Sequence, residues 1–396
     1  MIRYRGRWTP QDRREAIYRY LPFDVPLGTQ GISVRYGYER GPDAILDLGV
    51  ADPERFRGWS GSERRAVVIG PRAATPGYLA GPLPAGQWQV LIGLYRVPPE
   101  GLAYEVEVEL GTAEPAPLPA PPARPERPPR RDLPAAPGRQ WLAGDLHSHT
   151  VHSDGVLTPA ALGCLAAERG LDFLAVTDHN GVAHHPGLPG AGAHAGILLL
   201  PGQEVTTDEG HANAIGALPW IDFRRPSDAW LAAAEAGGGL LSINHPLAGP
   251  YSWRRPMTTQ PPLAEVWHAT WDRRSDAPLD WWAAWGGVPV GGSDFHRSGS
   301  DGLPGEPTTW VEAEELSLGA IVAALRAGRV SISAGPRGPV VVRHEDAIVA
   351  VGAEGAELVG PDGSRHAIRG ERERVPSGRG LHRLVDPGGL TLALIP

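Results

Sequence analysis

The first third of the chain alternates hydrophobic and polar residues with a period of two. The runs "GISVRYGYE", "RRAVVIG", "QWQVLIGLYRV" and "LAYEVEVEL" lie between turns that contain glycine and proline. A period of two places successive side chains on opposite faces of a strand. Short strands of this kind, separated by turns, are typical of an antiparallel sandwich. We therefore predict a β-sandwich accessory domain over residues 1–112.

The pattern is then lost in a proline-rich stretch. Residues 113–139 read "AEPAPLPAPPARPERPPRRDLPAAPGR". Proline fixes its own backbone and cannot donate to a helix or sheet, so such a tract favours an extended, semi-rigid linker. We expect a linker here that builds no core of its own.

Apolar strands alternate with helical segments over residues 140–329. Thr158 and Pro159 suit the first positions of a helix, and Gly170 suits its end. Further helices are predicted in "PSDAWLAAAEAGG", "LDWWAAWGG" and "ELSLGAIVAALRAGR". Alternating strands and helices indicate an α/β domain with a mostly parallel sheet or barrel. Short apolar runs between glycine-rich turns predict a small β-rich C-terminal extension over residues 330–396.

Charge and composition remove several classes of function. The net charge of −8 argues against a nucleic-acid-binding face. All 37 basic residues are arginine, which excludes a lysine-dependent phosphate loop and a Schiff-base lysine. The single cysteine, Cys164, lies on an apolar helix face and is expected to pack in the core. No apolar run has the length of a membrane span, so we expect a cytoplasmic protein without a membrane partner.

Histidines and acidic residues gather where apolar strands end. His147 and His149 follow "WLAGDL", and similar residues follow four more apolar runs: Asp178 and His179, Glu204, His245, and Asp294 and His296. In a barrel of alternating strands and helices these ends converge on one rim, where active sites lie. Imidazole and carboxylate groups without thiolate suit Zn, Mn or Fe ions.

These motifs carry a family resemblance. "DLHSHTVHSDG", "AVTDHN", "PGQEVTT", "INHP" and "GGSDFH" resemble, in order, the motifs of the PHP (polymerase and histidinol phosphatase) superfamily of metal-dependent hydrolases. The segments "GHANAIG" and "EVWHATW" are most similar to its carbaryl-hydrolase-like branch. The resemblance spans residues 144–328. It implies a distorted (β/α)7 barrel that holds two or three divalent metal ions.

The resemblance also implies a role for individual residues. A first ion would be held by four residues, a second by Glu204 as a bridge with two histidines, and a third by three residues near the rim. The three sets are His147, His149, Glu204 and Asp294; Glu204, His211 and His245; and Asp154, His179 and His296. His211, in "EGHANAIG", is only a short loop beyond Glu204, and an ordinary loop histidine is the alternative. Asp154 stands where some relatives have histidine, which leaves a two-ion site open.

The expected activity is hydrolysis of a small-molecule ester by a metal-activated water molecule. Phosphomonoesters or phosphodiesters are favoured, carbamate or carboxyl esters are the alternative, and a non-catalytic regulatory module is a third possibility. Glu204, Asp294 and His211 are the expected catalytic residues at the metals, and Arg297 the expected phosphate-binding arginine. His268 is a candidate substrate contact. Tryptophans 267, 271, 281, 282 and 285 cluster before the last motif, and one or two of them could line the pocket.

Overall fold

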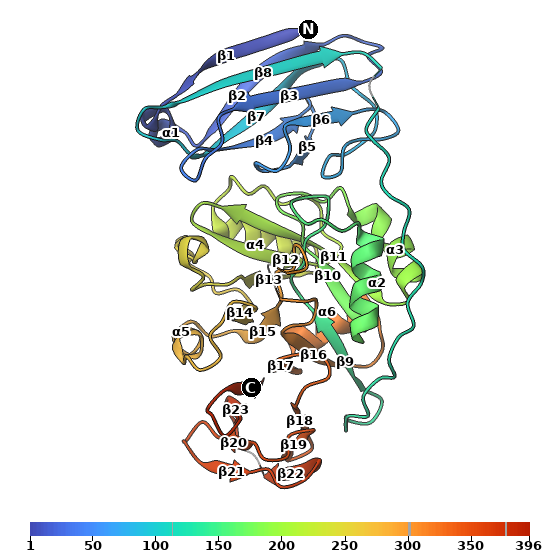
Figure 1. Cartoon of the computed structure of the whole chain (residues 1–396), viewed down its shortest axis with the longest axis vertical. Coiled ribbons are helices and arrows are strands. Elements are labelled where there is room, and N and C mark those ends of the chain that lie inside the picture. Colours follow the sequence, from blue (N-terminus) through green and yellow to red (C-terminus); the bar gives the residue numbers. More distant parts are fainter. Residues whose placement is uncertain (113, 300–301, 377) are drawn as a thin grey trace. The chain divides into compact units, whose positions relative to one another are not determined.

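The computed structural model describes residues 1–112, 114–299, 302–376 and 378–396 (Figure 1). Residue 113, the predicted start of the linker, lies outside these ranges. The chain divides into two compact units. The first comprises residues 1–120, 151–154 and 178–184, and the second comprises residues 121–150, 155–177 and 185–396. Among the helices of the described residues, none combines the length and hydrophobicity needed to cross a membrane.

The N-terminal part of the first unit contains two antiparallel sheets around one core. One sheet has the order β1-β8-β3-β6 and the other β2-β7-β4-β5. Val34 and Val108 of the first sheet and Leu48 and Val90 of the second are fully buried in the same hydrophobic cluster. The bounds are β1 Ile2–Trp8, β2 Tyr18–Val25, β3 Ile32–Tyr38, β4 Ile45–Ala51, β5 Phe56–Trp59, β6 Ala66–Ile69, β7 Gly86–Arg96 and β8 Leu102–Leu110, with a short helix α1 at Pro10–Glu15.

Two later segments belong to this first unit. Arg64 donates hydrogen bonds to the carbonyl oxygens of Val151 and Ser153, the latter at 2.9 Å. The backbone N–H of Gly77 donates to Nδ1 of His152 at 3.1 Å. These bonds connect residues 151–154 to the turns between the N-terminal strands.

The second unit is built on one mixed sheet with helices packed against it (Figure 1). Helices α2, α4, α5 and α6 form at the four predicted places, and α2 begins with Thr158 as its N-cap and ends at a left-handed Gly170, as predicted. Their bounds, with those of α3, are α2 Pro159–Arg169, α3 Leu188–Ala195, α4 Ser227–Ala236, α5 Ala277–Trp285 and α6 Leu318–Arg326. The strands are β9 Gln140–Asp145, β10 Phe173–Val176, β11 Leu198–Thr207, β12 Gly210–Ile215, β13 Leu240–Ile243, β14 Leu263–His268, β15 Val288–Gly292 and β16 Thr308–Ala313.

The sheet departs from a regular strand–helix repeat at β12. Strands β9, β10 and β11 are parallel neighbours, as are β13, β14 and β15, but β12 pairs antiparallel with both β11 and β13. A tight hairpin therefore replaces a helical connection between β11 and β12. Backbone bonds from Asp294 N to His147 O (3.0 Å) and from His149 N to Phe295 O (2.9 Å) join the residues after β15 to those after β9. The ends of β9 and β15 thus meet, although they are far apart in the sheet order.

The C-terminal strands continue the same sheet. The order after β16 is β17-β24-β23-β20-β21, while β18, β19 and β22 form a separate antiparallel sheet. The residues after 329 are therefore β-rich and are joined to the central sheet through the pair β16–β17. The bounds are β17 Val330–Ser333, β18 Val340–His344, β19 Ala347–Val351, β20 Glu357–Val359, β21 Arg365–Ala367, β22 Arg372–Pro376, β23 His382–Val385 and β24 Thr391–Ile395.

The proline-rich segment packs against the second unit from residue 121 onward. It has no helix or strand over residues 114–139, but Leu133 is buried in the hydrophobic cluster of that unit. Arg127 and Arg130 both bind Oδ1 of Asp172, at 3.0 and 2.6 Å. The arginines and one leucine of this segment therefore attach it to the domain that follows.

Candidate metal centre

His147 and His149 lie directly after β9, as the strand-end pattern predicted. Both side chains are fully buried. Asp145, the last residue of β9, accepts hydrogen bonds from the backbone N–H groups of His147 (3.1 Å), Ser293 (3.0 Å) and Gly305 (2.8 Å). Burial raises the pKa of Asp145 despite these three bonds. This carboxyl group fixes the turn that aims the two histidines.

Glu204 and His211 face each other across a hairpin. Glu204 lies inside β11 rather than at its end, and His211 lies in β12, just beyond the short turn that follows β11. The hairpin register pairs Thr206 with His211. Nδ1 of His211 comes within 3.2 Å of Oε1 of Glu204. Continued strand pairing, rather than a loop, brings the two residues together.

Six of the predicted ligands converge in the second unit. Nε2 of His147 lies 3.2 Å from Oε1 of Glu204 and 3.1 Å from Oδ1 of Asp294. Nε2 of His149 lies 3.0 Å from the same Asp294 oxygen, and Nε2 of His245 lies 3.4 Å from Oε1 of Glu204. The ligand atoms of His147, His149 and Glu204, and separately those of His147, His245 and Asp294, lie within 4.8 Å of one another. Together with His211, these residues form a compact cup of nitrogen and oxygen atoms.

The cup fits divalent metal ions. Nε2 of His147 is buried and has no aligned hydrogen-bond partner among the described residues, although Oε1 of Glu204 and Oδ1 of Asp294 lie 3.2 and 3.1 Å away. Buried polar atoms in folded proteins are nearly always hydrogen-bonded, so this nitrogen needs an explanation. Neutral imidazole nitrogens and carboxylate oxygens are ordinary ligands of Zn and related metals. His147, His149, Glu204, His211, His245 and Asp294 would supply them.

The charges in the cup also favour a cation. Burial alone would raise the pKa of Asp294, but His147 and a hydrogen bond from His149 hold this pKa well below its ordinary value. Burial alone would lower the pKa of His147, but the carboxylates of Asp294 and Glu204 raise it well above its ordinary value. The concentrated negative charge stabilises a positive charge nearby, and a divalent metal ion carries more positive charge than a proton does.

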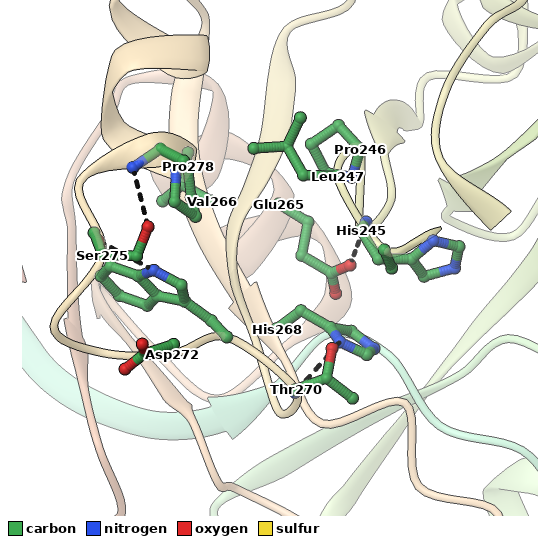
Figure 2. Close-up of a pocket in the computed structure, with 13 residues that line it drawn as sticks. His245, Pro246, Leu247, Glu265, Val266, His268, Thr270, Asp272, Ser275 and Pro278 are labelled. Carbon is green, nitrogen blue, oxygen red and sulfur yellow. Dashed lines mark hydrogen bonds between the residues drawn. The ribbon is translucent and has the colours of Figure 1, made fainter. Parts of the chain in front are cut away.

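Two residues that the sequence did not single out hold the ligands in place. Oε1 of Glu265, on β14, is 3.1 Å from Nδ1 of His147. Oε2 of the same residue accepts the backbone N–H of His245 at 2.6 Å (Figure 2). Asn244 donates to Oε1 of Glu204 at 2.8 Å. Such outer contacts orient metal ligands. The signal for Glu265 is a carboxylate inside the otherwise apolar run "LAEVWHA", and Asn244 immediately precedes the ligand His245.

Two further histidines lie at the edge of the cup. Nε2 of His268 is 3.2 Å from Oδ2 of Asp294, and its Nδ1 is 2.8 Å from Oγ1 of Thr270. The His296 ring stacks on that of His149 with 4.2 Å between centroids, and its Nδ1 lies 2.7 Å from the backbone oxygen of Asp294. The structure therefore places His268 beside a ligand, in keeping with its candidate role.

The remaining predicted residues are placed as follows. Asp154 and His179 belong to the first unit, where Oδ2 of Asp154 lies 3.5 Å from Nε2 of His179. Arg297 directly follows His296 and is exposed. The roles of these three residues, like those of the other predicted ligands, stay predictions.

A cavity of about 220 Å³ adjoins the cup at His245. Glu265 and His268, which contact cup residues, line it too (Figure 2). The rest of its lining includes apolar side chains, among them Leu247, Val266, Trp271 and Pro278. A group attached to a substrate held at the cup could enter this space.

Known proteins resemble parts of the chain. No family model matches it. The 5'-3' exoribonuclease Rnm of Salmonella typhimurium is 43% identical over 86 residues, which are 21% of this chain and 29% of that protein. Rnm of Escherichia coli is 43% identical over 65 residues, 16% of this chain and 22% of that protein.

One similar solved structure is a two-domain protein from Bacteroides vulgatus that contains a predicted PHP-like metal-dependent phosphoesterase. The match covers 69% of this chain and 99% of that one, with 19% sequence identity and a TM-score of 0.44. An amidohydrolase from Chromobacterium violaceum is 18% identical, with a TM-score of 0.33, over 47% of this chain and 96% of that one. The chain spans less than a third of the length of the curated relatives that it matches.

Proposed function

We propose that the protein is a metal-dependent hydrolase of phosphomonoesters or phosphodiesters. The observation that supports this most strongly is the cup of six ligands, in which imidazole nitrogens and carboxylate oxygens converge within a few ångströms. Divalent ions held there would activate a water molecule as the nucleophile and offset the charge of a phosphoryl group. We propose two or three ions, with Zn, Mn and Fe as the candidates.

The chain's own residues have separate tasks in this proposal. Glu204 and Asp294 bring negative charge to the centre of the cup, and the histidines around them fix its shape. Glu265 keeps Nε2 of His147 available by engaging the other ring nitrogen. His268 lines the cavity beside Asp294, and it would bind a substrate oxygen by exchanging its contact with Asp294 or with Thr270. The exposed Arg297 is proposed to bind a phosphate oxygen from outside the cup.

A second candidate is removal of nucleotides from RNA. Removal of nucleotides is favoured by the identity of 43%, over part of the chain, to two proteins named as 5'-3' exoribonucleases. An exoribonuclease also breaks a phosphodiester bond, which agrees with the ester class proposed above. The net charge of −8 and the absence of a basic stripe in the sequence favour a small substrate instead.

A side-by-side assay tests the proposal. The purified chain, loaded with Mn or Zn, is given p-nitrophenyl phosphate, bis-p-nitrophenyl phosphate, a short 5'-phosphorylated RNA, 1-naphthyl acetate and 1-naphthyl N-methylcarbamate. We expect kcat/KM to be highest for a phosphate ester and to vanish on chelation. Asp294→Asn should lower it by at least about 10²-fold. Asp222→Asn, a change of the same kind at a carboxylate paired with Arg224, should leave it unchanged.

Two results would contradict the proposal. A carbamate or acetate hydrolysed faster than every phosphate ester, with that activity lost in Asp294→Asn, would assign the cup to the other ester class. Fewer than one ion per chain by elemental analysis, after purification without chelator, would remove the metal centre itself.

A further inference from the structure

The cavity beside the cup differs in character from the cup. None of the described residues that line it is arginine, and its ionisable residues apart from histidine are Glu265 and Asp272. A second phosphate or carboxylate would therefore meet negative charge there. The apolar part of the lining instead suits a group that leaves water readily.

We infer that this cavity, which we call the side pocket, holds an uncharged aromatic ring on the leaving group of the ester. The inference rests on the proposed function and adds a substrate class to it. Its volume of about 220 Å³ exceeds the roughly 150 Å³ of an apolar protein cavity that accepts benzene. One ring, or two fused rings, therefore fits.

The aromatic wall of the side pocket is fixed before any ligand arrives. The Trp271 ring packs edge-on against the buried Trp267, with 5.0 Å between centroids and an angle of 86°. Its indole N–H donates to the backbone oxygen of Ser275 at 3.1 Å. A flat group entering the pocket meets an aromatic surface that needs no ordering, which favours tight binding.

The side pocket is continuous with the cup through shared residues. His245 and His268 both line the pocket (Figure 2). His245 is also a predicted metal ligand, and His268 lies 3.2 Å from Asp294. A phosphoryl group at the cup and a ring directly bonded to its oxygen would therefore occupy both spaces at once. Aryl esters should bind better than alkyl esters for this reason.

Two phosphonates that cannot be hydrolysed test the inference without turnover. Methylphosphonate and phenylphosphonate carry the same charged head and differ in the group that would enter the side pocket. Calorimetry on the full-length, Mn-loaded protein should show phenylphosphonate binding at least about tenfold more tightly. Ala277→Trp, at an exposed residue of the lining, should abolish this preference and leave methylphosphonate binding unchanged.

A second pair of variants keeps the inference testable if Ala277→Trp does not fold. Leu247→Asp places a charge in the lining at a side chain that is 47% exposed, and it should also remove the preference. Leu27→Asp makes the same change at an exposed leucine of the first unit and should keep it.

The outcomes separate the inference from the proposed function. Equal binding of the two phosphonates, or a preference that survives in both lining variants, would overturn the side-pocket assignment while the phosphoesterase proposal stands. Binding of neither phosphonate, together with no turnover of any phosphate ester, would overturn both.

Discussion

At the scale of single residues, Glu265 decides which nitrogen of His147 can bind a metal. Its carboxylate lies 3.1 Å from Nδ1 of His147 and accepts the backbone N–H of His245. A hydrogen bond at Nδ1 places the imidazole proton there and leaves the lone pair of Nε2 for an ion. One carboxylate thus orients two predicted ligands.

Glu265→Gln should weaken metal binding without unfolding the protein. The amide keeps the size of the side chain but has a single acceptor oxygen for two donors. We expect the apparent metal affinity, measured by competition with a chelator, to fall by about 10–100-fold. Glu312→Gln, at another buried carboxylate that accepts a backbone N–H (from Ala136 at 2.8 Å), is the matched control. Wild-type affinity in Glu265→Gln would show that the contact has no orienting role.

The thiol of Cys164 should react slowly with alkylating reagents in the folded protein. Burial raises the pKa of its thiol, and the nearby carboxylate of Glu168 raises it further. A higher pKa means less thiolate at any given pH, and the thiolate is the reactive form. Alkylation by iodoacetamide at pH 8 should be slower in the native chain than in urea, and Cys164→Ser should keep kcat/KM within about twofold. Equal alkylation rates in the two states would contradict the burial argument.

At the scale of elements, the sequence identified the strand ends after which four of the predicted ligands lie, because an apolar run followed by histidine or acid is a local pattern. These four are His147, His149, His245 and Asp294. The helix α2, with its capping Thr158 and terminal Gly170, was predictable for the same reason. Helix α3 was not, since "LPGAGAHA" is rich in glycine and proline and forms a helix only through packing on α2 and β11. The position of His211 beside Glu204 depends on the antiparallel pairing of β12 with β11 and β13, which no local pattern encodes.

The end of β15 tolerates no side chain at Gly292. A Cβ atom there would lie 2.2 Å from Oε1 of Glu265 and 2.5 Å from Cβ of His147. Gly292→Ala should therefore lower the free energy of unfolding by about 1–3 kcal/mol in urea titrations of the metal-free protein. Gly319→Ala in α6, where an added Cβ meets nothing within 4 Å, should raise it by up to about 1 kcal/mol. Equal effects of the two substitutions would refute the close packing.

At the scale of the whole molecule, sequence order and compact units do not coincide. Residues 151–154 and 178–184 follow β9 and β10 in the chain, yet they belong to the unit of the N-terminal strands. Periodicity places domain boundaries along the chain, so the sequence predicted one division at the proline-rich tract and another before residue 330, and each predicted domain was one continuous segment. Arg64, Ser153 and His152 meet only in the folded unit.

Arg64→Ala should loosen the segment that carries Asp154. It removes the hydrogen bonds to the carbonyl oxygens of Val151 and Ser153. Hydrogen exchange followed by mass spectrometry should show faster exchange in peptides covering residues 151–154. The neighbouring Arg65, which is exposed and donates to Tyr38 at 3.5 Å, provides the control variant Arg65→Ala, in which exchange should match the wild type. Unchanged exchange in Arg64→Ala would show that the segment is held by other contacts.

The place of β24 in the sheet has a consequence for how the protein is made on the ribosome. Residues 391–395 pair with β17 on one side and β23 on the other. At roughly 5–20 residues per second, β17 leaves the synthesis site about 3–12 s before β24 does. During that interval β17 offers an unpaired edge next to β16, and unpaired edges invite pairing with other chains. Nascent molecules on crowded polysomes are therefore exposed to a misassembly hazard that the finished sheet no longer presents.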